Sequence, residues 1–429
     1  MAHDHRHASF RIGPIGPERL EEAAEVACRA FGGPAGEEER RYFRSGFDLE
    51  RALCAFDGDD RIIATSTSLP LELTLPNGGL CRAGGVAWTT TLPDHRGQGI
   101  LRALMEGQEG ILREQREAVA LLTASSGTLY RRFGYGPATM FAGLRIVAGL
   151  PRPSCASTGR GRSRPRLLAS AEARKILPGL YGQLRPLHVG AVDRSAAWWD
   201  VYLDDRPNFF GGDPGAAPLF HVVSLGADDE PEGYVSYRLL SEWLNGQPLQ
   251  TLEVEELLAA TPEAYVCLWS YCLESVGTNR VVYPRGRTDE PLRWLLSDPR
   301  CFEVVGQIDH LWAHLLDIPA ALSARGYAEA GGLTFEVEHG SGAERGSEQV
   351  ERYTLEVVRP GAGGALCAAG RTQADLVVDS ADLGSVYLGA VSFSALAAVG
   401  RVRELTPGAC RRADRLFAVG CAPHCTTKF

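Results

Sequence analysis

The stretch HRGQGILRALMEG, residues 95–107, places a basic loop with two glycines directly before an amphipathic helical pattern. A β-like segment at residues 80–92 precedes it. Backbone amides at a helix N-terminus present unsatisfied donors and the positive end of the helix dipole, and glycines let an anion approach closely. The pattern therefore predicts a strand, a pyrophosphate-binding loop and a helix. A tight strand-to-helix turn would use the same glycines, and the spacing matches neither a GxxxxGK[ST] loop nor a GxGxxG fingerprint.

The segments around this stretch predict a mixed sheet. We expect an opening strand at residues 9–12, helices at 17–31 and 38–46, and β-segments at 52–56, 61–68, 69–75 and 80–92. A helix to about residue 115, a buried strand at 118–124 and a helical turn near Leu129 follow. This order favours an α/β (α+β) fold over a doubly wound parallel sheet.

Composition limits the class of protein. A length of 429 residues predicts two or three domains, and we take three. The net charge of −9 lacks the basic excess that nucleic-acid binding needs. The eleven scattered cysteines indicate reduced thiols, and we see neither a signal peptide nor a transmembrane segment, so we expect a cytoplasmic protein with no membrane span.

The rest of the chain divides into two further blocks. Residues 151–166, rich in proline and arginine, indicate a linker. Residues 253–273 predict two helices separated at Thr261-Pro262, where the second would begin. From residue 307 the segments 330–342, 349–361 and 372–380 alternate like antiparallel strands, residues 339–349 indicate a hairpin loop, and residues 381–399 indicate helix around Gly389.

A second motif, later in the chain, indicates which family the loop resembles. After the predicted buried strand comes ASSGTLYRRFGYGP at residues 124–137, and HRGQGILRALM with LYRRFGYGPAT resembles the GCN5-related N-acetyltransferases (GNAT), specifically the enhanced-intracellular-survival (Eis) family. Segments 233–238, 255–269, 289–300, 311–327 and 374–390 also resemble that family, so the likeness spans nearly the whole chain. It implies an acetyl-CoA-binding acetyltransferase domain at 1–150, a degenerate second one at 151–303, a sterol-carrier-protein-like domain at 304–429, and a hexamer.

The resemblance also assigns site residues. The loop and helix start that would hold the pyrophosphate of acetyl-CoA, the co-substrate, comprise Arg96, Gly97, Gln98, Gly99, Ile100 and Leu101. The preceding strand, Thr89, Thr90 and Thr91, would offer backbone hydrogen bonds to the thioester and pantetheine arm, and Ser125 would contact that arm. The family usually has a valine-rich run where this chain has Trp88 and the threonines, which would reshape the acceptor side.

Two catalytic roles follow from the same resemblance. A protonated alkylamine, with a pKa near about 10.4, must lose a proton before it attacks a thioester, and the departing thiolate, with a pKa of about 8.5, needs a positioned acid. Tyr130 matches the family's general acid. The terminal carboxylate of Phe429, carried into the site by the third domain, matches the base; a frayed terminus is the alternative.

The acceptor is left open by these residues. The resemblance implies a small-molecule amine, aminoglycoside-like or polyamine, or a lysine amine. Lys428 stands where members that bind polycations often have an acid, which opposes such an acceptor. Glutamates could compensate but more simply form a solvated face: Glu21, Glu22, Glu25, Glu37, Glu38 and Glu39. The alternatives are a biosynthetic N- or O-acyltransferase of a secondary metabolite and a non-catalytic lipid- or hydrophobe-binding protein.

Two histidine-containing groups predict no metal site. His3, His5 and His7 lie together near the N-terminus, where we expect only adventitious metal binding. Cys421, His424 and Cys425 are closely spaced but lack a second ligand pair, so we interpret them as structural.

Overall fold

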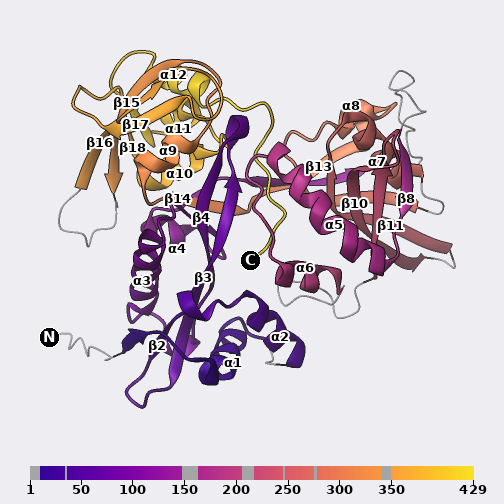
Figure 1. The fold of residues 1–429 in the computed structure, drawn as a ribbon, viewed down its shortest axis with the longest axis horizontal. Helices are drawn as coiled ribbons and strands as arrows, with labels where there is room; N and C mark the ends of the chain where they lie inside the picture. The colour runs from indigo at the N-terminus through magenta and orange to yellow at the C-terminus, as the bar shows by residue number, and fades with distance from the viewer. Residues whose placement is uncertain are drawn as a thin grey trace.

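The computed structural model describes residues 10–33, 36–146, 163–204, 217–244, 247–274, 278–339 and 349–429. It contains three sheets (Figure 1). The first sheet has the order β1 (Arg11–Gly13), β2 (Leu53–Phe56), β3 (Ile62–Thr74), β4 (Leu80–Thr91), β5 (Val119–Thr123), β14 (Leu311–Leu315) and β6 (Gly136–Pro137). Its helices are α1 (Leu20–Ala30), α2 (Glu37–Gly46), α3 (Ile100–Glu114) and α4 (Gly127–Tyr130).

The second sheet has seven strands and its own helices. Its order is β13 (Phe302–Asp309), β7 (Met140–Ile146), β12 (Thr278–Gly286), β11 (Gln247–Ala259), β10 (Pro231–Leu244), β9 (Leu219–Leu225) and β8 (Arg164–Leu167). The helices of this part are α5 (Ser170–Leu184), α6 (Ala196–Leu203), α7 (Pro262–Glu274) and α8 (Leu292–Leu295). Two apolar cores form here, one centred on Trp269 and the other on Tyr181 and Trp199.

The third sheet has five strands in the order β17 (Ala365–Ala369), β16 (Gln349–Val357), β15 (Gly331–His339), β18 (Leu376–Asp379) and β19 (Val402–Glu404). The helices α9 (Ile318–Ala324), α10 (Ser380–Tyr387), α11 (Phe393–Ala398) and α12 (Ala409–Leu416) belong to this part. Single 3-10 turns occur at Pro17–Arg19, Leu49–Arg51, Pro76–Gly78, Pro93–His95, Arg131–Phe133, Arg185–Leu187 and Pro299–Cys301.

The first two sheets exchange strands. β14 comes from late in the chain, yet it pairs with β5 and β6 of the first sheet. β7, which follows β6 after two residues, pairs with β12 and β13 of the second sheet. Each sheet therefore contains a strand whose neighbours along the chain belong to the other sheet, and this exchange joins the first and second parts.

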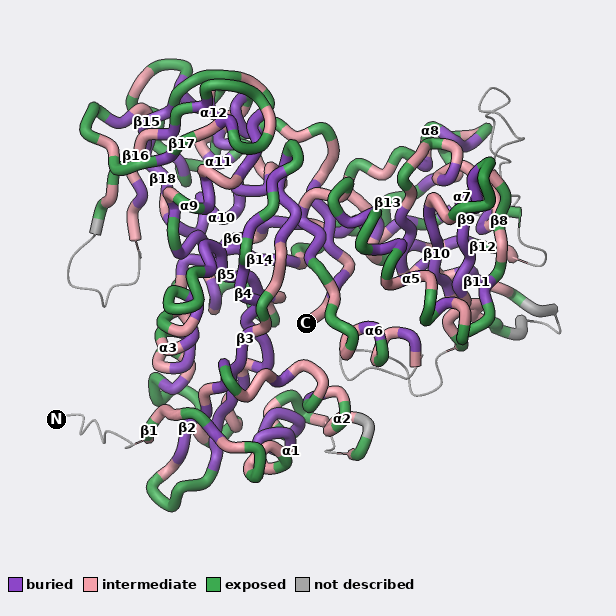
Figure 2. Tube along the Cα trace, viewed as in Figure 1, coloured by how far each residue is buried: buried purple, intermediate pink, exposed green. Residues whose placement is uncertain are grey.

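Most predicted elements of the first part are present, with differences in their limits. The segments predicted at 61–68 and 69–75 are one continuous strand, β3, because β4 pairs with it along almost its whole length. The opening strand is β1, at residues 11–13. The buried strands β3, β4 and β5 run through the centre of the first part (Figure 2).

Three predictions for the later parts are wrong. Residues 253–259 belong to strand β11, not to a helix, because β10 pairs with them antiparallel; the helix begins at Pro262, capped by Thr261, whose hydroxyl accepts from the Ala264 amide at 3.1 Å. The end of the predicted linker forms strand β8, and its other residues, 151–162, lie outside the described residues. Strand β18 pairs parallel to β15, not antiparallel.

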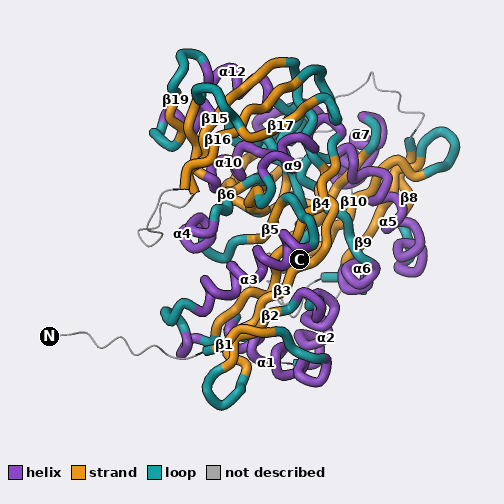
Figure 3. The backbone as a smooth tube through the Cα atoms, turned by 60° about the vertical axis from the view of Figure 1, so that its left-hand side comes forward, coloured by secondary structure: helices purple, strands orange, loops and turns teal. Residues whose placement is uncertain are grey.

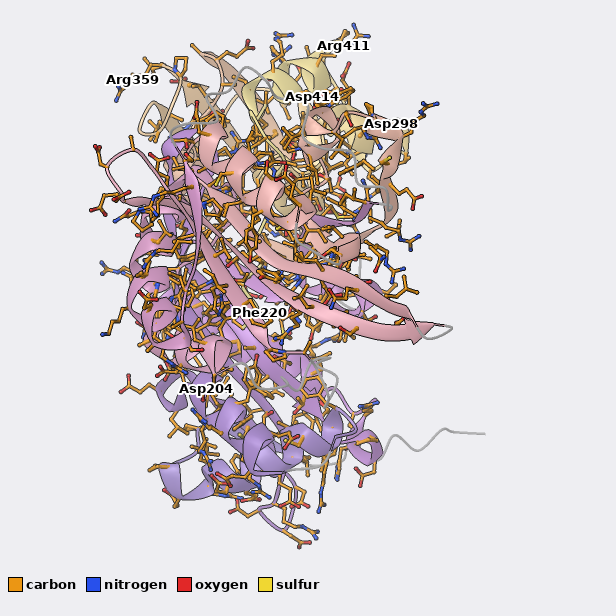
Figure 4. The ribbon with its side chains drawn as sticks, turned by 90° about the vertical axis from the view of Figure 1, so that its right-hand side faces the viewer. Asp204, Phe220, Asp298, Arg359, Arg411 and Asp414 are labelled. Carbon is orange, nitrogen blue, oxygen red and sulfur yellow. The ribbon has the colours of Figure 1, made fainter. Side chains whose placement is uncertain are left out.

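The C-terminal segment leaves the third part and ends between the other two. In the views of Figures 1 and 3 the C-terminus lies beside α6 and β3. The adjoining faces are also linked directly: Asp204, at the end of α6 (Figure 4), accepts a hydrogen bond from Arg41 of α2 at 2.6 Å. The chain thus brings its last residues to the junction of the first and second parts.

Candidate active site

The site is built where strands β4 and β5 separate. Their parallel pairing covers only Ala83–Gly85 of β4 and Val119–Leu121 of β5. β4 continues to Thr91, paired on its other side with β3, while β5 continues to Thr123, paired with β14. Beyond Gly85, the inner edges of the two strands therefore present backbone groups to the space between them.

A bulge shapes the part of β4 that continues beyond its pairing with β5. The register with β3 shifts between Thr65 and Thr67, and Trp88 has a left-handed backbone with φ of +52°. Such a bulge bends the strand and turns its peptide groups. The Thr90 hydroxyl bonds with Thr65 at 2.8 Å, and that of Thr89 bonds with Ser66 at 2.9 Å. These side chains are thus engaged with β3.

The predicted coenzyme loop leads into helix α3. Gly97 and Gly99 have φ of +78° and +86°, and a Cβ at either position would meet no atom within 4 Å. The glycines therefore serve the backbone conformation and leave open space above the loop. Residues 96–99 are exposed, and Arg96 is held by hydrogen bonds to the carbonyls of Thr91 (3.3 Å) and Ala30 (3.2 Å).

The loop at residues 96–99 and the first turn of α3 together form a cradle for an anion, and the backbone amides of that first turn are its hydrogen-bond donors. The first amides of a helix have no intrahelical partner. Ile100 is buried in a small core against β2 and β3, and Leu101 packs partly into the core that contains Tyr130. Both side chains fix the start of the helix, so that its amides point toward the open space. The cradle fits a pyrophosphate.

Tyr130 ends the short helix α4 in an apolar environment. It is 7% exposed and packs with Val86 and Tyr135. Burial raises the pKa of the Tyr130 phenol, while a hydrogen bond with Ser125 lowers it, and the first effect is larger. The phenol therefore stays protonated at neutral pH and can donate a proton. Ser125, expected at the coenzyme arm, is placed here beside Tyr130.

Phe429 packs against β4 at the point where that strand leaves β5. An ideal Cβ on Gly85 would lie 2.8 Å from Cε2 and 2.9 Å from Cδ2 of the Phe429 ring, so the ring rests directly on the glycine. The same ring touches two apolar cores, one of which contains Trp88, Phe43 and Ala87. Docking of the terminal residue is thus observed in place of a frayed end.

Trp88 is enclosed by aromatic side chains from α2 and the end of α1. Its ring centroid lies 4.8 Å from that of Phe43, 5.5 Å from Tyr42 and 6.3 Å from Phe31, each at a steep angle. Trp88 is buried and forms part of the wall on which Phe429 rests. Trp88 therefore contributes directly to the packing around the terminal residue.

A partly buried lysine lies next to the terminal residue, and the glutamates of α1 and α2 are largely paired. Lys428 is partly buried, and its pKa is lowered, first by desolvation and then by Arg285, against the opposing effect of Glu255. Many of the acidic side chains of α1 and α2 are paired with arginines: Glu21 bonds Arg40 (3.1 Å) and Arg44 (2.6 Å). They form an exposed, largely neutralised face rather than an acidic pocket.

The tail contains the second histidine-containing group, Cys421, His424 and Cys425, and the contacts of His424 are structural. The His424 amide donates to Val189 at 2.7 Å, and its ring Nε2 lies 2.7 Å from the Arg285 carbonyl. His424 thus anchors the tail. Within the described ranges there is no group of three or more His, Cys, Asp or Glu side chains that could hold a metal ion. His3, His5 and His7 lie outside those ranges.

The residues that hold the tail from the second part were not found by sequence reasoning. They include Arg194, Trp198 and Glu256; only Glu256 lies in a segment that resembles the family, and that resemblance assigned it no role. None of the helices in the described residues is long and apolar enough to cross a membrane.

Comparisons with known proteins agree with this architecture. Two acetyltransferase (GNAT) domain models match residues 11–138 and 190–322, and a sterol carrier protein domain model matches residues 318–426. An uncharacterized N-acetyltransferase of Streptomyces griseus is 32% identical over 391 residues, covering 90% of this chain and 91% of that protein. The N-acetyltransferase Eis of Mycobacterium tuberculosis is 30% identical over 402 residues, covering 92% and 93%.

Solved structures give the same result. The crystal structure of Eis1 from Mycobacterium abscessus has a TM-score of 0.82 and 30% identity, and the match covers 98% of this chain and all of that one. A GCN5-related N-acetyltransferase from Anabaena variabilis, 20% identical with a TM-score of 0.78, shares the fold.

The tandem fold, the loop before α3 and the matching domain models define an N-acetyltransferase of the GCN5-related class with a sterol-carrier-like third domain. Within that class, the chain belongs to the Eis family. The alternative of a non-catalytic hydrophobe-binding protein is therefore set aside.

Proposed function

We propose that this protein transfers acetyl from acetyl-CoA to an amine of a small molecule by direct attack, with the Phe429 carboxylate as base and Tyr130 as acid. The observation that carries the proposal is the seating of Phe429 on Gly85, where β4 and β5 part. In that position the last residue of the third domain borders the space between the strands, and the amine and the thioester must meet in that space.

The residues present fit acetyl-CoA as co-substrate, which supplies an activated acetyl thioester when bound. Gly97, Gly99 and the first amides of α3 would hold the pyrophosphate, and the free edge of β4 at Thr89–Thr91 would hold the arm. Backbone groups do most of this work, so the threonines and Trp88 do not hinder it.

The proton balance assigns one role to each end of the site. The acceptor first gives one proton to solvent, because only the neutral amine attacks. As its nitrogen then forms the bond to the acetyl carbon, the Phe429 carboxylate takes the second proton that the nitrogen loses. As the carbon–sulfur bond breaks, the Tyr130 hydroxyl gives its proton to the sulfur. Each positioned proton transfer contributes about 10²- to 10⁴-fold to such reactions. No covalent bond to the enzyme forms.

The acceptor follows from charge. Lys428 beside Arg285 and the paired glutamates of α1 and α2 support an acceptor with few positive charges. We therefore rank a singly charged amine, of a metabolite or of a lysine side chain, above an aminoglycoside or a polyamine. Acylation of a hydroxyl on such a metabolite is the second candidate. A cytoplasmic location and a hexameric state are further proposals, which rest on the free cysteines of the described residues and on family membership respectively.

The first test is thiol release from acetyl-CoA against a panel of aminoglycosides, polyamines, lysine peptides and arylamines, with mass detection of products. The protein must carry no C-terminal tag. We expect turnover with a weakly charged amine. Multiply acetylated aminoglycoside would refute the charge argument, and acetyl-CoA hydrolysis without transfer to any acceptor would refute the assigned reaction.

The companion test adds one glycine after Phe429. Moving the carboxylate by one residue should reduce kcat about 100-fold or more, because proton transfer depends on position, while binding of acetyl-CoA stays unchanged. Normal turnover by the extended protein would remove the terminal base from the mechanism.

A further inference from the structure

Two residues near the end of the tail, Thr426 and Thr427, are held by the second part of the molecule through a buried ion pair. Arg194 and Glu256 are joined by two hydrogen bonds, at 2.6 and 3.0 Å, and their side chains are 1% and 2% exposed. The remaining donors of Arg194 reach the tail: Nε donates to Thr427 Oγ1 at 3.0 Å, and Nη2 to Thr426 Oγ1 at 3.1 Å. Glu256 in turn accepts from the Thr426 hydroxyl.

A second contact reaches still closer to the terminus. The indole Nε1 of Trp198, on α6, donates to the Lys428 carbonyl at 2.8 Å. This carbonyl belongs to the peptide bond that joins Lys428 to Phe429. The Trp198 ring also lies over the Arg194 guanidinium, whose central carbon is 4.0 Å from the ring centroid. The two contacts therefore form one connected structure.

Stability alone does not account for this pair. Burying two charges costs desolvation energy that their attraction hardly offsets, and apolar side chains of similar volume often serve as well. What the charges add is direction, because each hydrogen bond has a fixed geometry. Here the directed hydrogen bonds of Arg194 fix the positions of Thr426 and Thr427 in the tail.

We propose that Arg194, Glu256 and Trp198 form a tail clamp, by which the degenerate second domain positions the Phe429 carboxylate in the first domain's active site. The inference rests on the proposed role of that carboxylate. It gives the second domain a function in the reaction, in which all three act as positioning residues through their contacts with the tail.

The clamp predicts a particular kinetic pattern. Trp198→Phe keeps an aromatic ring over Arg194 but removes the donor to the Lys428 carbonyl. Thr427→Val keeps the shape of the tail but removes the hydroxyl, while Thr427→Ser keeps the hydroxyl. We expect kcat to fall about tenfold in Trp198→Phe and Thr427→Val, with the KM for acetyl-CoA within about twofold, and Thr427→Ser to retain most of the activity.

A matched control separates positioning from folding. Trp269→Phe makes the same change in the other core of the second part, away from the tail. It should lower the melting temperature at least as much as Trp198→Phe, because Trp269 is fully buried, and leave kcat unchanged. Equal losses of kcat in the two tryptophan variants would show a general effect of stability and would overturn the clamp.

The decisive measurement combines each variant with the glycine extension after Phe429. If the clamp acts only through the carboxylate, Trp198→Phe and Thr427→Val should change kcat less than twofold in the extended protein. A loss that persists in full would overturn the clamp and leave the terminal base intact. If the extension itself has no effect on kcat, the Phe429 carboxylate is not the base, and the proposed clamp is refuted as well.

Discussion

The substitution Gly85→Ala adds a single carbon atom and tests whether activity depends on the packing of the Phe429 ring against residue 85. The added Cβ would lie 2.8 and 2.9 Å from two carbons of the Phe429 ring and 2.6 Å from Leu71 Cδ1. Ordinary carbon contacts lie at about 3.5–4.0 Å, so the ring must retreat by roughly 1 Å. The methyl group of Leu71 is the end of a flexible side chain and yields more easily.

The size of the expected effect follows from that displacement. A misplacement of about 1 Å in a catalytic arrangement can cost about 100-fold in rate, or about 2.7 kcal/mol in the activation barrier. We therefore expect kcat of Gly85→Ala to fall by one to two orders of magnitude. Affinity for acetyl-CoA should change little, because the pyrophosphate cradle at Gly97 and Gly99 is built from another segment.

The neighbouring glycine provides the control. A Cβ on Gly84 would meet Leu112 Cδ2 at 2.2 Å and Glu117 Oε2 at 2.6 Å, on the face of the sheet that α3 covers. Gly84→Ala should thus cost about 1–3 kcal/mol of stability through overpacking, without moving the tail.

The assay is steady-state kcat and KM for both variants, with melting temperatures and acetyl-CoA binding measured on the same preparations. The reasoning fails if Gly85→Ala keeps the wild-type kcat, or if Gly84→Ala, once corrected for the folded fraction, loses as much turnover as Gly85→Ala.

Three further predictions address other parts of the site. Tyr130→Phe should lower kcat at least about 100-fold while acetyl-CoA still binds, because the acid is lost; equal turnover would exclude Tyr130 as the acid. Gly97→Ala should weaken acetyl-CoA binding, measured by calorimetry, since its φ of +78° disfavours a side chain although the space is open; unchanged affinity would argue against the cradle. Burial lowers the pKa of His424 from 6.5 to about 4. The unfolded state then binds more protons below about pH 6.5, so stability should fall by about 1.2 kcal/mol between pH 7 and 5.5 through this residue. His424→Gln should flatten the pH dependence of the melting temperature, and an unaltered slope would contradict this.

Local sequence was sufficient for the coenzyme loop. Two glycines, a preceding strand and an amphipathic helix lie within about twenty residues, and the structure forms them as Gly97, Gly99 and α3. Tyr130 was selected because its motif, which follows β5 directly, resembles that of the family. Their assigned roles remain predictions.

Reasoning from local sequence failed for segments whose structure depends on pairing with another strand. Residues 253–259 have apolar positions compatible with a helix, but pairing with β10 makes them a strand. Propensity is a weak signal that tertiary pairing overrides. The parallel pairing of β15 with β18 could not be read from alternation either, because a strand pattern is the same in both directions.

The sequence by itself indicated the class of enzyme, through motifs that resemble the Eis family, and the same resemblance selected the candidates for the coenzyme loop and for both catalytic roles. Only the tertiary structure decided how the terminus is held. Arg194 and Glu256 are 62 residues apart, and Arg194 is 233 residues from Thr427. No periodicity links positions so distant, and only the assembled domains turn them into one contact.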